Sequence, residues 1–187
     1  TEVFLAYDSQ RLYFAVVAYD RDPASIVATQ RKRDAELEGD DRIVLVLDPF
    51  LDKRNGYYFA FNPLGARQDA LIRGGVTLNK DWDGIWEVAT LITDFGWMAE
   101  GSIPLSTISF KTQVPAWGLN IERVVERSGE RVRWHGTERQ YEVNNLANAG
   151  HWVGLSELSR ASKYEIRPFS TLTYANDRVT GEETTRF

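Results

Sequence analysis

Tryptophans in polar loops are the residues best suited to bind a ligand. Trp82 stands between Asp81 and Asp83, while Trp134 and Trp152 lie near expected strand ends and have polar neighbours. A flat aromatic ring can stack on the apolar face of a pyranose while polar groups reach the sugar hydroxyls. These three tryptophans are therefore candidates for stacking on a sugar. Large loop aromatics are also often half-buried for packing alone, so a structural role stays open.

Three polar residues could supply hydrogen bonds to such a ligand. Asn62 ends an expected strand that is rich in Tyr and Phe, and Arg67 and Gln68 come shortly after it. Asn62 also precedes Pro63, and capping of a turn explains an Asn at that position equally well.

Acidic residues form local groups that could bind calcium, which takes about six to eight oxygen ligands. The candidate ligands are Asp40 and Asp41, Asp48 and Asp52 (with Asn55 nearby), and Asp81 and Asp83. None of these groups has the spacing of an EF-hand loop. Turn formation and loop solubility are the alternative explanation for each group.

Signals for catalysis are weak. Glu87 and Glu100 lie in consecutive expected strands and are the only pair proposed for a glycosidase, which needs two carboxyl groups about 5–10 Å apart. His135 and His151 lack the spacing of a zinc site. Met98 alternates with Trp97 in a strand pattern, so no haem is expected. We therefore expect no enzyme activity.

The bulk composition excludes several classes of protein. The net charge of -5 argues against a nucleic-acid partner, since binding phosphates needs a concentrated basic surface. The absence of cysteine excludes disulfides and thiolate metal sites. No run of about 18 apolar residues is present, and the chain opens at Thr1 inside a strand pattern, as expected for a processed or excised piece.

Alternating apolar residues and regularly spaced turns predict an all-β fold, an antiparallel β-sandwich of jelly-roll or immunoglobulin-like type. The expected strands cover residues 12–19, 43–47, 57–62, 70–73, 86–92, 97–103, 117–125 and 131–135. One or two short helical turns are expected, from Pro23 toward Arg31 and at Pro104–Ile108. Trp86, Trp97 and Trp117 lie inside strand patterns and are expected in the core. We place this sandwich at residues 1–160 and a C-terminal extension at residues 161–187.

Three stretches in order carry a resemblance to a known family. The first stretch runs from Arg33-Asp34 through Gly39-Asp40-Asp41 to Asp48-Pro49-Phe50. The second is Arg54-Asn55-Gly56-Tyr57-Tyr58-Phe59, followed by Asn62-Pro63-Leu64-Gly65-Ala66 and Asp69. The third is Trp82-Asp83-Gly84-Ile85-Trp86-Glu87, followed by Gly96-Trp97-Met98-Ala99-Glu100 and Ile103-Pro104-Leu105-Ser106. Together they resemble the family 9 carbohydrate-binding module-like domain. More specifically, they resemble the version at the N-terminus of Gram-negative outer-membrane β-barrel proteins of unknown function. The resemblance covers roughly Val3 to Leu158.

This resemblance implies a jelly-roll-like sandwich, often with structural calcium, that binds oligo- or polysaccharide. It also implies a location in the periplasm or at the cell surface, and a covalently linked barrel whose approach or first strand would be residues 161–187. Two other functions stay open. The domain could cap or assemble the barrel without binding sugar, or it could be a glycoside hydrolase.

Overall fold

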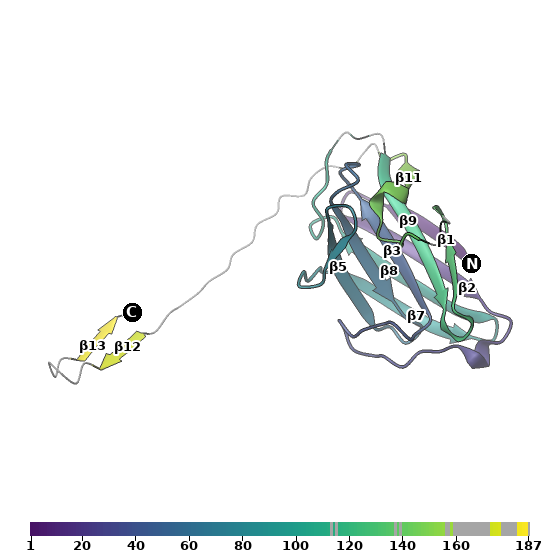
Figure 1. Ribbon diagram of the computed structural model, residues 1–187, viewed down its shortest axis with the longest axis horizontal. Helices are drawn as coiled ribbons and strands as arrows, with labels where there is room; N and C mark the ends of the chain where they lie inside the picture. Colours follow the sequence, from purple (N-terminus) through teal and green to yellow (C-terminus); the bar gives the residue numbers. More distant parts are fainter. Residues whose placement is uncertain are drawn as a thin grey trace.

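The chain folds as a two-layer antiparallel β-sandwich, as the alternation predicted (Figure 1). The computed structural model describes residues 1–112, 114, 116–136, 138, 140–155 and 158, and the backbone of 173–176 and 183–186. Most of the expected extension at residues 161–187 lies outside the described residues. Its two described segments, β12 (Thr173–Asn176) and β13 (Glu183–Arg186), pair with each other.

The first sheet has four strands in the order β1-β2-β8-β7. Its strands are β1 (Glu2–Tyr7), β2 (Arg11–Tyr19), β7 (Glu87–Thr93) and β8 (Gly96–Pro104). Among the described residues, β1 pairs only with β2, so it forms one edge of this sheet.

The second sheet has seven strands, with the order β10-β9-β3-β4-β5-β6 and with β11 also paired to β9. Its strands are β3 (Arg42–Asp48), β4 (Gly56–Phe61), β5 (Arg67–Arg73), β6 (Thr77–Asn79), β9 (Ala116–Val125), β10 (Glu130–Arg133) and β11 (Gly150–Val153). One side of β9 pairs with β3, while its other side pairs with β11 in the first half and β10 in the second. This sheet is therefore the wider of the two.

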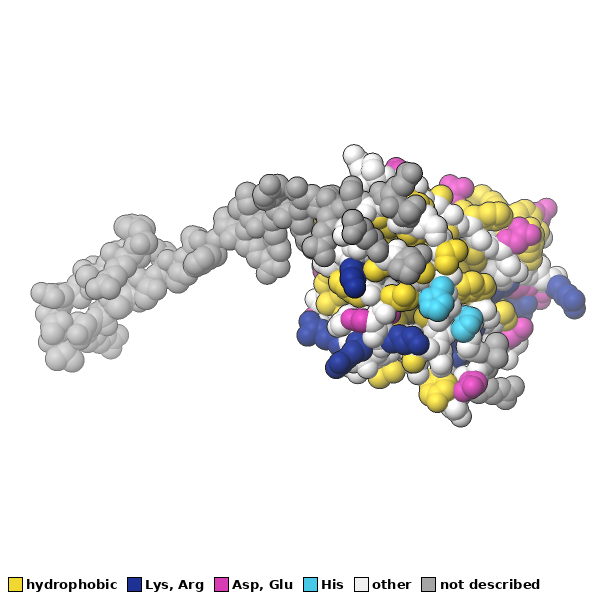
Figure 2. Space-filling model, turned by 90° about the horizontal axis from the view of Figure 1, so that it is seen from above, with side chains coloured by type: hydrophobic (Ala, Val, Ile, Leu, Met, Phe, Trp, Pro, Cys, Tyr) yellow, Lys and Arg dark blue, Asp and Glu magenta, His cyan; other side chains and the backbone are white. Residues whose placement is uncertain are grey.

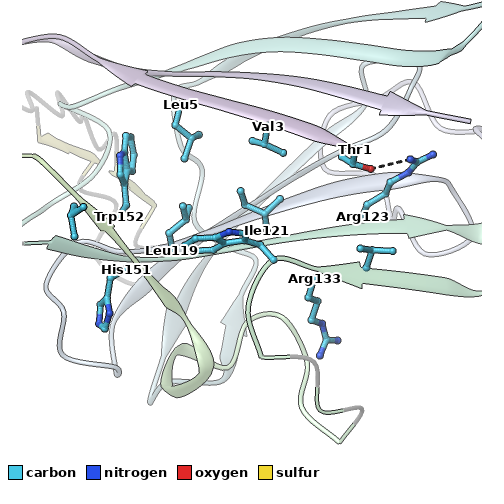
Figure 3. Close-up of a pocket in the computed structure, with 12 residues that line it drawn as sticks. Thr1, Val3, Leu5, Leu119, Ile121, Arg123, Arg133, His151 and Trp152 are labelled. Carbon is cyan, nitrogen blue, oxygen red and sulfur yellow. Dashed lines mark hydrogen bonds between the residues drawn. The ribbon is translucent and has the colours of Figure 1, made fainter.

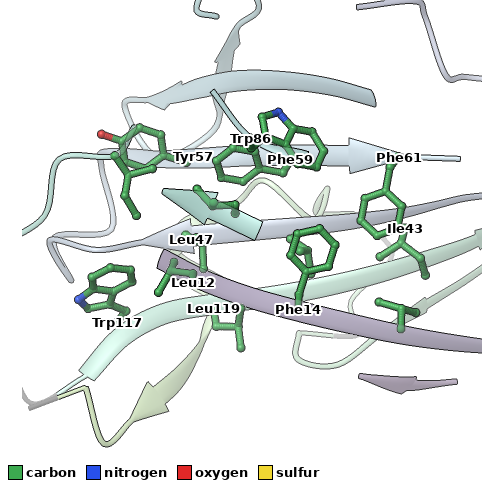
Figure 4. Close-up of a cluster of buried hydrophobic side chains, with 14 of the residues drawn as sticks. Leu12, Phe14, Ile43, Leu47, Tyr57, Phe59, Phe61, Trp86, Trp117 and Leu119 are labelled. Carbon is green, nitrogen blue, oxygen red and sulfur yellow. The ribbon is translucent and has the colours of Figure 1, made fainter. Parts of the chain in front are cut away.

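The core lies between the sheets, where inward-facing aromatic rings interlock (Figure 4). Phe14 of β2 stacks on Phe61 of β4 with 5.4 Å between ring centroids, and Phe61 meets Trp97 edge-on at 6.1 Å. Trp86 and Trp117 are also fully buried, so the three tryptophans expected in the core are confirmed there. Burial of such large rings is a main source of stability, because each removes a large apolar area from water.

A second, smaller core covers the outer face of the second sheet. Val44 and Val46 of β3 point to this face and pack in one cluster with Leu37 and Leu146 from the connecting segments. Because β3 is covered on both faces, all of its residues are buried. This explains why its sequence is continuously apolar instead of alternating.

Three short 3₁₀ turns are the only helical elements among the described residues: η1 (Pro23–Ser25), η2 (Glu126–Ser128) and η3 (Leu146–Asn148). The first begins where Pro23 predicted it but ends at Ser25, before the expected Arg31. The segment after Pro104 closes as a turn through a 2.9 Å bond from Thr107 N to Pro104 O and is not helical. Within the described part of the chain, no helix is long and apolar enough to span a bilayer.

Candidate functional site

An apolar groove runs along the edge of the sandwich where the second sheet extends past β1. We call this cavity of about 460 Å³, which lies between β1 and strands β9, β10 and β11, the edge groove. Val3 and Leu5 point from β1 toward β9, which contributes Leu119 and Ile121 (Figure 3). The groove exists because the narrower first sheet leaves the inner face of the outermost strands uncovered.

Trp134 lies at this uncovered face with its ring mostly in solvent. It follows β10 directly, and its backbone N–H donates to Ile121 O at 2.9 Å, which places the side chain on the groove side. The ring rests against Gly150, where an added Cβ would lie 2.5 Å from a ring carbon. With 54% of its surface exposed, Trp134 offers a free aromatic face.

Trp152 flanks the same groove but is half-buried. It pairs with Trp117 across β11 and β9, and the two indole rings meet edge-on with centroids 6.4 Å apart. Tyr7 contacts the Trp152 ring at 6.3 Å and donates its hydroxyl to Gly154 O at 2.6 Å. These contacts hold the Trp152 ring in one orientation as a side wall.

The charged residues beside the groove are neutralised within the protein. Arg123 donates to Thr1 Oγ1 at 3.0 Å and lies 3.5 Å from the Asp20 carboxylate. Arg133 pairs with Glu122, and both Arg133 and His151 point away from the space between β1 and β9 (Figure 3). Both histidines are visible on one face beside hydrophobic side chains (Figure 2). The groove therefore carries aromatic and aliphatic walls, and its two arginines are already paired with acids.

Trp82 lies elsewhere, after β6 at the other end of the second sheet. Its ring is half-buried against Tyr57 and Phe59, with centroid separations of 5.1 and 6.1 Å. Gly84 lies so close to the ring that an added Cβ would sit 2.7 Å from it. The structure thus brings two of the three candidate tryptophans together and separates the third.

A buried carboxylate fixes the loop that carries Trp82. Asp69 accepts hydrogen bonds from Gly84 N at 2.6 Å and from Trp86 Nε1 at 2.9 Å. Arg33 donates to Asp69 at 3.0 Å, to Gly84 O at 2.8 Å and to Asp83. Burial raises the pKa of Asp69, and these hydrogen bonds only partly offset the effect.

The polar residues proposed as sugar partners do not line the edge groove. Arg67 is half-buried on β5, and its buried Nε has no acceptor among the described residues. Gln68 is buried on the opposite face of the same strand. Asn62 is fully buried: its amide donates to Gln30 O and Asp40, and its oxygen accepts from the backbone of the following turn.

The candidate calcium ligands bind protein N–H groups instead of pointing at a common centre. Asp48 accepts from the N–H groups of residues 50, 52 and 53, and Asp52 accepts from those of residues 54 and 55. Asp41 accepts from Glu126 N at 2.7 Å and keeps one buried oxygen without a partner among the described residues. One free oxygen falls far short of the ligand set that calcium needs.

One acidic cluster among the described residues has metal-like geometry. Carboxylate oxygens of Asp34, Asp69 and Asp83 lie within 4.8 Å of one another. Arg33 forms ion pairs with all three, so its guanidinium occupies the position of a cation. Exposed Asp81 is outside this cluster. These residues fit an arginine-centred ion-pair network and do not fit a calcium site.

Asp40 illustrates how such a carboxylate stabilises the fold. Burial alone would raise its pKa, but hydrogen bonds from the backbone and side chain of Thr29, from Gln30 N and from Asn62 outweigh it and leave the pKa below the ordinary 3.8. A lowered pKa means that the ionised form stabilises the native state. This contribution is complete above the ordinary pKa and is lost as the pH falls through the lowered value.

We expect Asp40→Ala to lower the free energy of unfolding by about 1–3 kcal/mol at pH 7, because it leaves buried donors without an acceptor. The difference between the variant and the parent chain should shrink in the pH range below 3.8. Urea unfolding at pH 7 and at several acidic pH values measures both effects. Equal destabilisation at all pH values would contradict the role of the charge.

The acid pair considered for hydrolysis lies on the outer face of the first sheet. Glu87 is opposite Ser102 and Glu100 is opposite Ala89, so the two acids are diagonal neighbours on adjacent strands. Both are exposed, and neither lines the edge groove. Met98 lies on the same outer face, opposite Leu91 of β7.

Three solved structures share this architecture. A proposed carbohydrate-binding protein from Bacteroides uniformis ATCC 8492 has a TM-score of 0.64 and 14% identity, covering 80% of this chain and 75% of its own. Two structures of a family 9 carbohydrate-binding module from Caldicellulosiruptor kristjanssonii match as well. The glucose complex has a TM-score of 0.54 and 18% identity, and the match covers 89% of this chain and 79% of that one. The cellotriose complex has a TM-score of 0.55 and 16% identity, and the match covers 91% of this chain and 83% of that one.

The fold is that of a family 9 carbohydrate-binding module. No protein-family model matches the sequence, and no curated protein is significantly similar to it. Identities below one fifth mean that the family 9 likeness is established for the architecture. The sugars in those complexes are ligands of the other proteins.

Sequence reasoning missed the aliphatic part of the edge groove. Val3, Leu5 and Ile121 alternate as ordinary inward-facing strand residues. They line a groove because the two sheets differ in width. No local sequence pattern indicates how wide a sheet will be. The strand edges would have to be known before these residues could be selected.

Proposed function

We propose that this chain is a non-catalytic carbohydrate-binding domain that holds a sugar against the exposed ring of Trp134 in the edge groove. The observation that carries the proposal is that Trp134 and Trp152 line the same groove of a family 9-like sandwich. Trp134 offers a stacking face, and the fixed Trp152 ring limits how the ligand can lie. The fold neighbours, which include modules in complex with glucose and cellotriose, support a carbohydrate ligand.

The charges around the groove favour a neutral sugar. Arg123 and Arg133 are held by Asp20 and Glu122, so an anionic ligand would have to displace an existing ion pair. Stacking with few polar contacts gives modest affinity, and attachment to a larger assembly would raise it through effective concentration.

We expect Trp134→Ala to weaken binding of glucose or cellotriose by about tenfold, since loss of an aromatic contact worth roughly 1.4 kcal/mol changes the dissociation constant by that factor. Isothermal titration calorimetry measures the change. Phe4→Ala is the matched control, because Phe4 is 57% exposed and points away from the groove. Sugar binding that is unchanged in Trp134→Ala would assign the ligand to another surface, and no binding to the folded parent chain would reject the proposal.

We also propose that the chain works outside the cytoplasm as part of an outer-membrane β-barrel protein. The support is the sequence resemblance of Val3–Leu158 to domains in that setting. Fractionation of cells that express the whole gene product, followed by detection of this domain, tests the location. Recovery in the cytoplasmic fraction would reject it.

A further inference from the structure

The outer edge of β1 lies beside the edge groove. Among the described residues, β1 pairs with β2 on one side and with nothing on the other. Natural edge strands are commonly blocked by lysine, proline or a covering loop, because their free N–H and C=O groups can pair with another strand. The sequence of β1 contains neither lysine nor proline, and its only charged residue is Glu2.

Two exposed apolar side chains and one half-buried one lie beside this edge. Val132 is opposite Arg123 of β9, and Trp152 is opposite Trp117. The backbone N–H of Trp134 donates to Ile121 O. These three positions of β9 face the first sheet, so the side chains of Val132, Trp134 and Trp152 lie on the inner face of the second sheet. Neighbouring strands of a sheet lie about 4.8 Å apart. One more strand beside β1 would therefore lie over β10 and β11 and cover these side chains, continuing the interface between the two sheets (Figure 3).

We propose that the edge groove accepts an extended strand of another polypeptide, which pairs with β1 and packs alternate apolar side chains on Val132, Trp134 and Trp152. This mode of recognition takes affinity from main-chain hydrogen bonds and specificity from pockets for every second side chain. It goes beyond the proposed sugar binding and does not depend on it.

Charge defines the solvent face of the added strand. Glu2 and Phe4 point to the outer side of β1, and opposite charges on adjacent strands stabilise a sheet. A lysine or arginine on the added strand near Glu2 would therefore be favoured. On the groove side Arg123 is already paired with Asp20, so that face of the strand should be apolar and uncharged.

A second copy of this chain does not fit the groove through β1. Pairing of two β1 strands about a twofold axis would bring both second sheets to the same side of the joined sheet. Each of these sheets extends past its own β1, so β10 and β11 of one copy would overlap those of the other. The occupant is therefore a single strand without a wide second layer beneath it.

The probe is a capped synthetic decapeptide in which valine alternates with threonine and lysine. Addition of the peptide should slow hydrogen–deuterium exchange in β1, because the free amides of its outer edge become hydrogen-bonded. Two control peptides are matched in composition: one has the valines grouped together, and the other has N-methyl groups on alternate amides. Both controls should bind at least tenfold more weakly.

Val132→Lys places a charge in the groove and should weaken peptide binding at least tenfold, while Leu91→Ala, at an exposed side chain of β7 on the opposite edge of the first sheet, should leave it unchanged. Thermal unfolding of both variants verifies that they are folded. Equal binding of the N-methylated peptide, or protection that appears elsewhere and not in β1, would overturn the proposal. So would absence of binding, or self-association that protects β1 in the peptide-free protein.

Sugar titrations on the same samples keep the two proposals separate. If both ligands bind, they should compete, because each covers Trp134. This competition is the one consequence that rests on the proposed function. Binding of the peptide without binding of sugar would support the strand site and reject the carbohydrate proposal. Binding of sugar without binding of the peptide would support the carbohydrate proposal and reject the strand site.

Discussion

Replacement of Asp69 by alanine is expected to lower the free energy of unfolding by about 2–5 kcal/mol, because two buried donors lose their acceptor at a cost of about 1–3 kcal/mol each. The side chain of Asp69 is fully buried and accepts from Arg33, from Gly84 N and from Trp86 Nε1. The variant leaves the two buried N–H donors without their acceptor, while Arg33 keeps its contacts with Asp34, Asp83 and Gly84 O. It should also release the loop that carries Trp82, because the hydrogen bond from Gly84 N to Asp69 holds this loop two residues after the tryptophan.

Chemical denaturation at pH 7 measures this effect, and tryptophan fluorescence of the native state reports on the loop. Asp69→Asn is the matched control, since it keeps the size and one oxygen but loses the charge that faces Arg33. It should cost less than the alanine variant. A loss below about 1 kcal/mol for Asp69→Ala would mean that water replaces the carboxylate and that the network is not structural.

The fold could be predicted from sequence because its determinants are local. The apolar runs of β2 and β3 predicted both strands, and in β2 the structure buries Leu12, Phe14, Val16 and Ala18 on the face expected to hold them together. Trp86, Trp97 and Trp117 were assigned to the core for the same reason. Short paired segments such as β6 and β11 were not predicted, because three or four residues are too few to establish a period.

The site depends on relations that are not local. Trp82, Trp134 and Trp152 look alike in sequence, each with polar neighbours, yet only the last two share the edge groove. Their separation is set by strand order. Acidic residues show the same limit. Asp48 ends β3 and Asp83 lies in a loop, but Asp48 accepts hydrogen bonds from backbone N–H groups and Asp83 pairs with Arg33.

Gly101→Val is expected to destabilise the domain by about 3 kcal/mol or more, through overpacking of a close-packed core. Gly101 of β8 lies opposite Phe14 of β2, and both face inward. An added Cβ would lie 2.2 Å from Phe14 Cζ and 2.5 Å from Glu87 O. The ring cannot retreat easily because it stacks on Phe61, and the carbonyl belongs to the neighbouring strand.

A double-mutant cycle with Phe14→Leu isolates the ring contact from the backbone contact. The shorter side chain should recover part of the loss, giving a favourable coupling of about 0.5–3 kcal/mol between the two substitutions. Ala89→Val, a similar enlargement on the exposed face of β7, should change stability little, because β-branched residues suit strands. Additive losses in the cycle would show that the Glu87 carbonyl alone excludes a side chain at position 101. In that case the close approach of β7 and β8, and not the aromatic core, is what requires glycine there.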